Sequence, residues 1–138
     1  TLFPYTTLFR SVFCGKKVLS PSLALMDDLQ KKTLVFSQVP QPELEGVAEW
    51  IPLVSENFEE NWNAVLDEFA KRGVHRLCVE TGATLAQNIL ASGLWNRFFV
   101  LQSSQKMESG LAWRSGMEPE FQKVETCGED VLWTALHP

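Results

Sequence analysis

Cysteine and histidine are scarce in this sequence. Of 138 residues only three are cysteines, Cys14, Cys78 and Cys127, and no C-x-x-C pair occurs. An odd number of widely spaced cysteines is typical of reduced thiols in an intracellular protein, not of a disulfide framework. His75 and Cys78 lie an odd number of residues apart in a predicted strand, so their side chains point to opposite faces. We therefore expect no metal site.

Long apolar runs and an excess of basic side chains are also lacking. No hydrophobic stretch approaches the roughly 20 residues that span a bilayer. The 17 acidic and 12 basic side chains give a net charge of −5, which disfavours nucleic acid and anionic membranes as partners. With 45% hydrophobic residues, the chain is long enough for one domain with its own core. We expect a cytoplasmic protein whose ligand is a small molecule.

The signatures of several enzyme classes are missing. The sequence contains neither G-x-G-x-x-G nor G-x-S-x-G, and no cysteine stands at a convincing helix start. These patterns therefore assign no catalytic residue. What the chain does contain is a series of short apolar runs and amphipathic stretches, which is typical of a mixed α/β fold.

The apolar pattern predicts one clear helix and several strands. Residues 58–72 carry an apolar stripe at helical spacing, Asn57 is the expected N-cap and Gly73 the stop. Short apolar runs predict strands at residues 12–14, 33–37, 77–79 and 98–101. We expect the last two strands to be buried. Pro52 indicates that an extended segment around it lies at a sheet edge. Residues 121–126 and 131–136 predict a terminal hairpin. A strand at 77–79 directly after the helix would complete a parallel crossover unit.

Residues 74–94, VHRLCVETGATLAQNILASGL, are the most informative stretch. A predicted strand ends at Glu80, and after Thr81 and Gly82 the apolar spacing becomes helical until Gly93. Such a turn directs backbone N–H groups and the positive end of the helix dipole at a ligand above the sheet, most often a phosphate. A plain strand-to-helix turn, in which Gly82 only suits the geometry, explains the same spacing.

Residues 1–11, TLFPYTTLFRS, resemble the conceptual translation of a sequencing-library adapter. We therefore expect 1–11 to be an artefact and 12–138 to be the C-terminal part of a domain that is incomplete at its N-terminus. A native strand with Phe3, Tyr5 and Leu8 is the alternative.

The sequence Val79 to Ala86, VETGATLA, and the Gly93-Leu94 step resemble the C-terminal reductase domain of the bifunctional riboflavin-biosynthesis deaminase-reductase, RibD. Gly128-Glu129-Asp130 is similar to the family's G-x-D turn, and the order of elements agrees from Val12 to Leu136. The resemblance implies a dihydrofolate-reductase-like mixed sheet, parallel in the centre, with a C-terminal antiparallel hairpin.

The same resemblance implies a function and a set of site residues. The cofactor would be NADPH and the substrate a phosphoribosylamino-pyrimidine, 5-amino-6-(5-phosphoribosylamino)uracil, which is reduced to the ribitylamino product; a homodimer is possible. Glu80 would contact the substrate, and Gly15 would lie near the cofactor. The residues that would cradle the NADPH phosphates are Gly82, Ala83, Thr84, Leu85 and Ala86.

The chain also departs from the family pattern. Cys14 stands where the family often has Asp, and Trp95-Asn96-Arg97-Phe98 replaces V-D-E-[LI]. We therefore expect the family's dimer contacts and part of its substrate pocket to be altered in this chain. The zinc deaminase signature is absent, so we expect no deamination and no turnover by this fragment alone. The alternative function is a non-catalytic nucleotide-binding or interaction module on the same fold.

Overall fold

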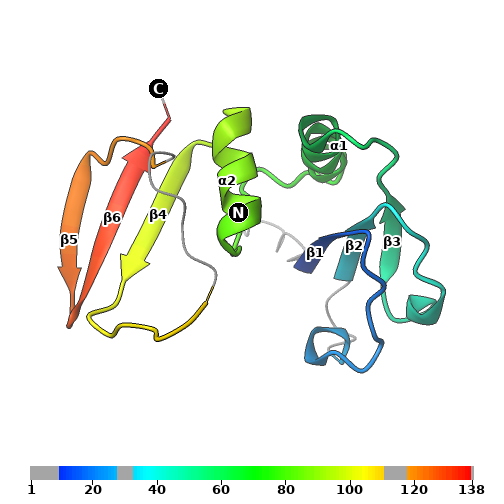
Figure 1. Ribbon diagram of the computed structural model, residues 1–138. Coiled ribbons are helices and arrows are strands. Elements are labelled where there is room, and N and C mark those ends of the chain that lie inside the picture. Colours follow the sequence, from blue (N-terminus) through cyan, green and yellow to red (C-terminus); the bar gives the residue numbers. More distant parts are fainter. Residues whose placement is uncertain (1–9, 28–32, 111–117, 138) are drawn as a thin grey trace, which may run out of the picture. The chain divides into compact units, whose positions relative to one another are not determined.

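In the computed structural model of the protein, the structure describes residues 10–27, 33–110 and 118–137. The chain forms two compact units, Thr1–Leu77 and Cys78–Pro138, and each is described by itself. The first unit holds a parallel sheet and a long helix, and the second holds a shorter helix and an antiparallel sheet (Figure 1).

The sheet of the first unit is built around its middle strand. Strands β1 (Arg10–Gly15), β2 (Thr33–Ser37) and β3 (Glu49–Pro52) pair in parallel in the order β1-β2-β3. Every residue of β2 is at most 1% exposed, as a strand covered on both faces requires. The predicted strand at 33–37 is confirmed, and Pro52 lies in an edge strand as expected.

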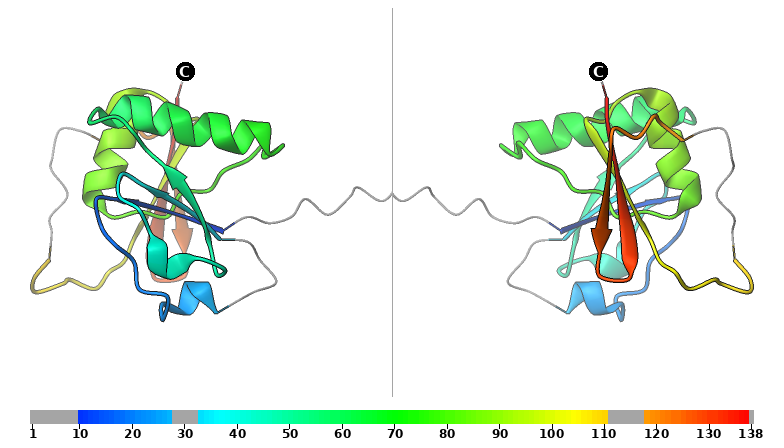
Figure 2. Two further views of the ribbon diagram at one scale, coloured as in Figure 1. Left: turned by 90° about the vertical axis from the view of Figure 1, so that its right-hand side faces the viewer. Right: turned by 90° about the vertical axis from the view of Figure 1, so that its left-hand side faces the viewer.

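The two faces of β2 are covered by different elements. On one side Val35 packs with Met26 of the 3₁₀ turn η1 (Ala24–Met26) and Leu44 of η2 (Pro42–Leu44). On the other side the ring of Phe36 lies 5.5 Å from that of Phe69 in α1. Figure 2 shows both 3₁₀ turns at the end of the first unit opposite α1. Successive side chains of a strand point to opposite faces, so both faces of β2 are occupied.

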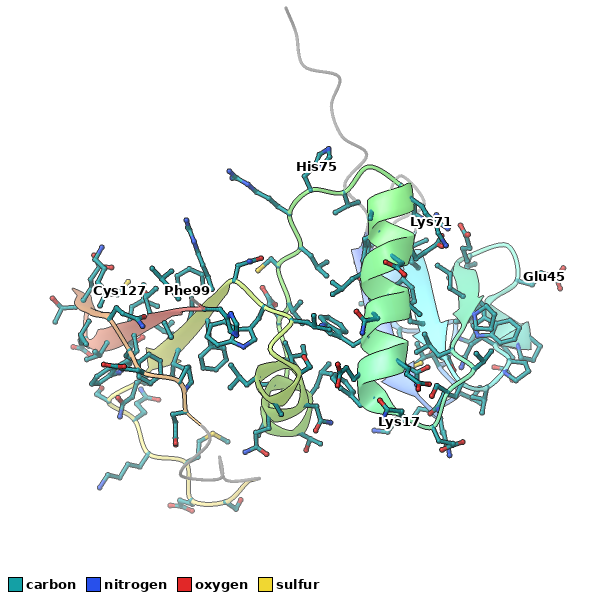
Figure 3. The ribbon with its side chains drawn as sticks, turned by 90° about the horizontal axis from the view of Figure 1, so that it is seen from above. Lys17, Glu45, Lys71, His75, Phe99 and Cys127 are labelled. Atoms are coloured by element: carbon teal, nitrogen blue, oxygen red, sulfur yellow. The ribbon has the colours of Figure 1, made fainter. Side chains whose placement is uncertain are left out.

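Helix α1 (Phe58–Lys71) agrees with the sequence prediction. The Asn57 side chain accepts a hydrogen bond from the Glu60 N–H at 3.2 Å, and Gly73 follows the helix with φ at 73°. Trp62, Val65 and Phe69 of the predicted apolar stripe are buried. Figure 3 shows α1 lying over the strands of this unit.

An ion-pair triad ties the end of α1 to the start of β3. The Arg72 guanidinium lies 2.6 Å from a carboxylate oxygen of Glu49 and 2.6 Å from one of Glu68, and the three side chains are between 20% and 31% exposed. Hydrogen bonding to Glu49, more than to Glu68, raises the already high pKa of Arg72. The guanidinium therefore stays charged at any ordinary pH, and the link does not depend on its titration.

The second unit pairs its three strands antiparallel. Strand β4 (Arg97–Gln102) and strand β5 (Lys123–Cys127) flank β6 (Asp130–Leu136). Gly128, with φ at 67°, takes part in the two-residue turn between β5 and β6. The predicted hairpin and the mixed fold, parallel in one sheet and antiparallel at the C-terminal end, are confirmed. Helix α2 (Ala83–Ser92) precedes β4 and ends at Gly93, with φ at 69°.

Two strand predictions need correction. Residues 77–79 are not a strand, and Leu77 and Val79 are 37% and 39% exposed. Residues 75–81 make no backbone hydrogen bond to another residue of the described ranges, so this short apolar run has no ladder partner and no parallel unit follows α1. His75 points away from the ribbon (Figure 3).

The expected burial of residues 98–101 is wrong as well. These residues do form β4, but Phe99 and Leu101 are 56% and 61% exposed. One face of the strand is half-buried through Phe98 and Val100, while the other face is uncovered. A run of apolar residues in the sequence does not show whether one face or both faces of the strand are covered.

The artefact interpretation of residues 1–11 falls largely outside the described ranges, although Arg10 and Ser11 begin β1, and it stays a prediction. Where the chain is described, no helix has the length and apolar character needed to cross a bilayer.

The same substitution, valine to alanine, at one buried and one exposed position tests the central role of β2. Val35→Ala removes two methyl groups from a site with 0% exposure and is expected to lower the free energy of unfolding by about 2 kcal/mol. Val54→Ala, at a position 94% exposed in the same unit, should change it by less than about 0.5 kcal/mol. Urea denaturation measures both, and equal effects would contradict the packing described for β2.

Candidate functional site

The start of α2 presents backbone donors without a side-chain cap. Gly82 is the N-cap residue, and the first intrahelical bond runs from the Ala86 N–H to the Gly82 carbonyl at 3.1 Å. The N–H groups of Ala83, Thr84 and Leu85 have no hydrogen bond to the described residues. The Thr81 hydroxyl donates to the Gly82 carbonyl at 3.1 Å instead of capping the helix. No acidic residue in the first turn offsets the positive end of the dipole.

Gly82 leaves this helix start open. Its φ of −77° is a value that any residue adopts, so the backbone itself does not require glycine. A Cβ built at this position would meet nothing within 4 Å. The space beside the exposed donors is therefore free, and a ligand can approach the backbone closely. A phosphate group fits this combination of open space, unpaired donors and positive dipole.

Ala86 differs from the other predicted phosphate contacts. Its N–H is used within the helix and its side chain is only 7% exposed, because it belongs to the buried face of α2 with Ile89. At the other end of α2, the Ser92 hydroxyl donates to the Ile89 carbonyl at 2.7 Å and accepts from the Leu94 N–H at 3.2 Å. Ala86 therefore packs inwards, whereas Gly82 and Thr84 before it are exposed.

Glu80 lies two residues before the N-cap of α2. Its side chain is exposed, and within the described ranges its carboxylate makes no hydrogen bond or ion pair. The sequence placed it at the end of a strand, but it follows an extended segment that has no ladder partner. The carboxylate is thus available to accept hydrogen bonds from a ligand near the start of α2.

Gly15 ends β1 in the first unit, so the predicted residues are divided between the two units. Its φ is 57°, and the pairing of β1 with β2 slips between Phe13 and Gly15. The Gly15 carbonyl accepts hydrogen bonds from the Gln38 N–H at 2.8 Å and the Ser37 hydroxyl at 3.0 Å. The carboxyl ends of parallel strands meet at this edge, which is where open α/β sheets bind ligands.

Sequence reasoning missed the polar residues that surround Gly15. Ser37 is fully buried. Gln41 is only 4% exposed, although it lies between Pro40 and Pro42 in a segment for which the sequence predicts a loop. A buried glutamine in such a segment has no local signal, because two of its partners, Leu19 and Lys17, lie 22 and 24 residues away along the chain.

Cys14, beside Gly15, is not an activated thiol. It is half-buried, and its Sγ lies 3.6 Å from the Phe36 carbonyl oxygen and 3.5 Å from that of Lys17. Burial raises its pKa, and this effect exceeds the opposing hydrogen bond with Ser37. Among the residues that the structure describes, no three His, Cys, Asp or Glu side chains gather as metal ligands would.

Comparison with solved structures identifies the fold. The chain aligns over 94% of its length, with a TM-score of 0.74 and 17% identity, with a diaminohydroxyphosphoribosylaminopyrimidine deaminase/5-amino-6-(5-phosphoribosylamino)uracil reductase from Thermotoga maritima. Two crystal forms of Acinetobacter baumannii RibD align over 92%, with TM-scores of 0.69 and 0.68 and 12% identity. The chain spans between 36% and 38% of these three chains. No curated protein sequence matches it.

The chain has the mixed α/β fold of these solved chains, and at these identities the structural likeness concerns the fold alone. The sequence itself matches the family described as RibD C-terminal domain over residues 4–132. The chain therefore belongs to the RibD C-terminal domain family.

The three thiols should differ in reactivity. Cys78 and Cys127 are exposed, whereas Cys14 is half-buried with a raised pKa. At pH 8 we expect iodoacetamide to modify Cys14 at least about tenfold more slowly than the other two, because a raised pKa lowers the thiolate fraction. Its rate should rise as the pH increases towards that pKa. Mass spectrometry of the alkylated peptides measures this, and equal rates at pH 8 would contradict the assigned environment.

Proposed function

We propose that this chain forms part of an NADPH-dependent reductase of riboflavin biosynthesis. The proposed substrate is 5-amino-6-(5-phosphoribosylamino)uracil, the compound named for the Thermotoga maritima relative. When bound, NADPH supplies the hydride that reduces the ribosyl group to the ribitylamino product. The observation that carries the proposal is the open, uncapped start of α2 behind Gly82.

The backbone of α2 has the chemistry that the cofactor needs. The N–H groups of Ala83, Thr84 and Leu85 can donate to phosphate oxygens, and the helix dipole favours the negative charge there. Thr84 is exposed, so its hydroxyl can add a donor. Gly82 allows the phosphate to approach the main chain. Gly15, at the end of β1, is the proposed contact in the first unit.

Glu80 is the proposed substrate contact. An exposed carboxylate without a protein partner accepts hydrogen bonds from hydroxyl or amino groups, which the substrate carries in its ribosyl and pyrimidine parts. Its place two residues before the proposed phosphate site lets one segment meet both molecules. The homodimer implied by the family resemblance stays a prediction.

A non-catalytic nucleotide-binding module is the second candidate. The open helix start supports it equally, because phosphate binding by backbone donors needs no chemistry from the protein. The two candidates differ at Glu80, since only the reductase requires a substrate contact there.

Gly82→Asp tests the phosphate site. Aspartate readily adopts the extended N-cap conformation seen at Gly82 and caps a helix well, so α2 should be slightly stabilised. Its carboxylate would occupy the place proposed for the phosphate and repel it. We expect the Kd for NADPH, measured by fluorescence titration, to rise by about tenfold or more while the Tm stays the same or increases.

The control is Asn57→Asp, which adds the same charge at the N-cap of α1 and keeps the cap there. This variant should bind NADPH like the wild type. Equal affinities for the wild type and Gly82→Asp, or an equal loss in both variants, would reject the phosphate site at α2.

Glu80→Gln separates the two candidate functions. It removes the charge and keeps the shape of the side chain, so we expect NADPH affinity within about twofold of the wild type. Calorimetric titration with 5-amino-6-(5-phosphoribosylamino)uracil in the presence of NADPH should show substrate affinity lowered by about tenfold or more, with loss of any turnover.

Glu45→Gln, at an exposed position on the first unit labelled in Figure 3, is the matched control and should change neither affinity. If Glu80→Gln weakens NADPH and substrate binding equally, its role as a substrate contact is wrong. A wild-type protein that binds NADPH but not the substrate would favour the non-catalytic module.

A further inference from the structure

A buried amide connects the loops that follow β1 and β2. The Gln41 side chain donates from Nε2 to the Lys17 carbonyl at 2.8 Å and to the Ser37 hydroxyl oxygen at 3.0 Å. Its Oε1 accepts from the Leu19 N–H at 2.9 Å. Gln41 thus holds both a donor and an acceptor of the chain that follows β1, while it is itself only 4% exposed.

Only one orientation of the Gln41 side-chain amide satisfies its backbone partners. A backbone carbonyl only accepts, so the group facing Lys17 must be the NH₂; a backbone N–H only donates, so the group facing Leu19 must be the oxygen. Both hydrogens of Nε2 and the oxygen therefore have partners. An amide satisfied in this way positions its neighbours rigidly, because every alternative leaves a buried polar group without a partner.

Ser37 carries this constraint to Gly15. Its Oγ accepts from the Gln41 amide at 3.0 Å and from the Val39 N–H at 3.1 Å, which uses both lone pairs. The single hydroxyl proton is left for one of three acceptors: the Gly15 carbonyl at 3.0 Å, the Val39 carbonyl at 2.9 Å or the Cys14 sulfur. The Gly15 carbonyl also accepts from the Gln38 N–H at 2.8 Å, so it points towards the protein.

The inward carbonyl of Gly15 has a consequence for the next residue. In a trans peptide the C=O and N–H point in opposite directions, so the N–H of Lys16 points away from the network. That N–H donates to no atom of the described residues, and Lys16 is exposed. The left-handed φ of Gly15 and the hydrogen bond from the Lys17 N–H to the Cys14 carbonyl at 3.1 Å define the turn that presents it.

We infer that Gln41 is a positioning residue for cofactor binding: through Ser37 it holds the Gly15–Lys16 peptide so that the Lys16 N–H faces an acceptor oxygen of the bound dinucleotide. This inference rests on the proposed function, in which Gly15 contacts NADPH. In this inference the Lys16 N–H contacts the dinucleotide, and Gln41 orients that N–H without touching the dinucleotide itself. The turn lies at the carboxyl ends of β1 and β2, where such sheets bind ligands.

A second buried amide in the same unit provides a matched control. Asn61, 6% exposed, donates to the Ser55 carbonyl at 2.7 Å and accepts from the Ser55 N–H at 3.2 Å. It therefore fastens the loop after β3 in the way that Gln41 fastens the loop after β1. Gln41→Met and Asn61→Leu each replace an amide by an apolar side chain of similar shape.

The experiment compares NADPH titrations and thermal unfolding of the wild type and both variants of the 138-residue chain. Both variants should lose thermal stability, because each removes buried hydrogen bonds. At a temperature where all three are folded, Gln41→Met should raise the Kd for NADPH by about tenfold, and Asn61→Leu by less than about twofold. Equal Kd changes in the two variants, or none, would overturn the inference.

Hydrogen exchange of the wild type gives a second measurement that needs no folded variant. NADPH should slow exchange of the Lys16 amide and leave that of Ser55 unchanged. Binding without protection of Lys16 would overturn the inference even if Gln41→Met fails to fold. If the wild type does not bind NADPH, the proposed function fails and this role of Gln41 with it. If NADPH binds and Gly82→Asp weakens it but Gln41→Met does not, only the role of Gln41 is rejected.

Discussion

Complete burial of β2 is the constraint from which the rest of the first unit follows. A strand covered on both faces needs an element on each side, and α1 and the two 3₁₀ turns supply them. The strand also begins and ends with buried hydroxyl groups. The Thr33 hydroxyl donates to the Leu25 carbonyl at 3.3 Å, and the Ser37 hydroxyl joins the network with Gln41 and Gly15. The hydrogen-bond network at the end of β1 is therefore a consequence of packing, because the buried Ser37 oxygen must have partners.

Anion binding in this protein would depend on the main chain. The sequence has fewer basic than acidic side chains, and a net charge of −5 gives no attractive field for a polyanionic dinucleotide. The start of α2 and the Lys16 N–H are both backbone donors without a partner in the described residues. Such donors are fixed dipoles that act at short range and are unaffected by the net charge of the surface. A weakly acidic protein can therefore hold phosphate groups where helix and turn geometry exposes its N–H groups.

The sequence predicted local structure well where the signal was contained within a few residues. The stripe and caps of α1, the Gly93 stop of α2 and the terminal hairpin with its Gly128 turn follow from spacing and backbone preference, and they are confirmed. The predictions were wrong for residues 77–79 and for the burial of β4. A short apolar run of this kind occurs in a covered strand, in an exposed edge strand and in an extended segment alike. What distinguishes these states is the presence of a partner strand or of a covering layer, and neither is encoded in the run itself.

The candidate site shows the same division. By itself the sequence determined the helix that follows Gly82, its stop at Gly93 and the family to which the chain belongs, because these depend on neighbouring residues and on a contiguous motif. Only the tertiary structure decided that the helix start is uncapped, that Ala86 faces inwards, and that Gln41 reaches the chain 22 and 24 residues before it. The physical reason is that a buried polar group takes whatever partners the packed elements bring within hydrogen-bond distance, and that proximity is a property of the fold.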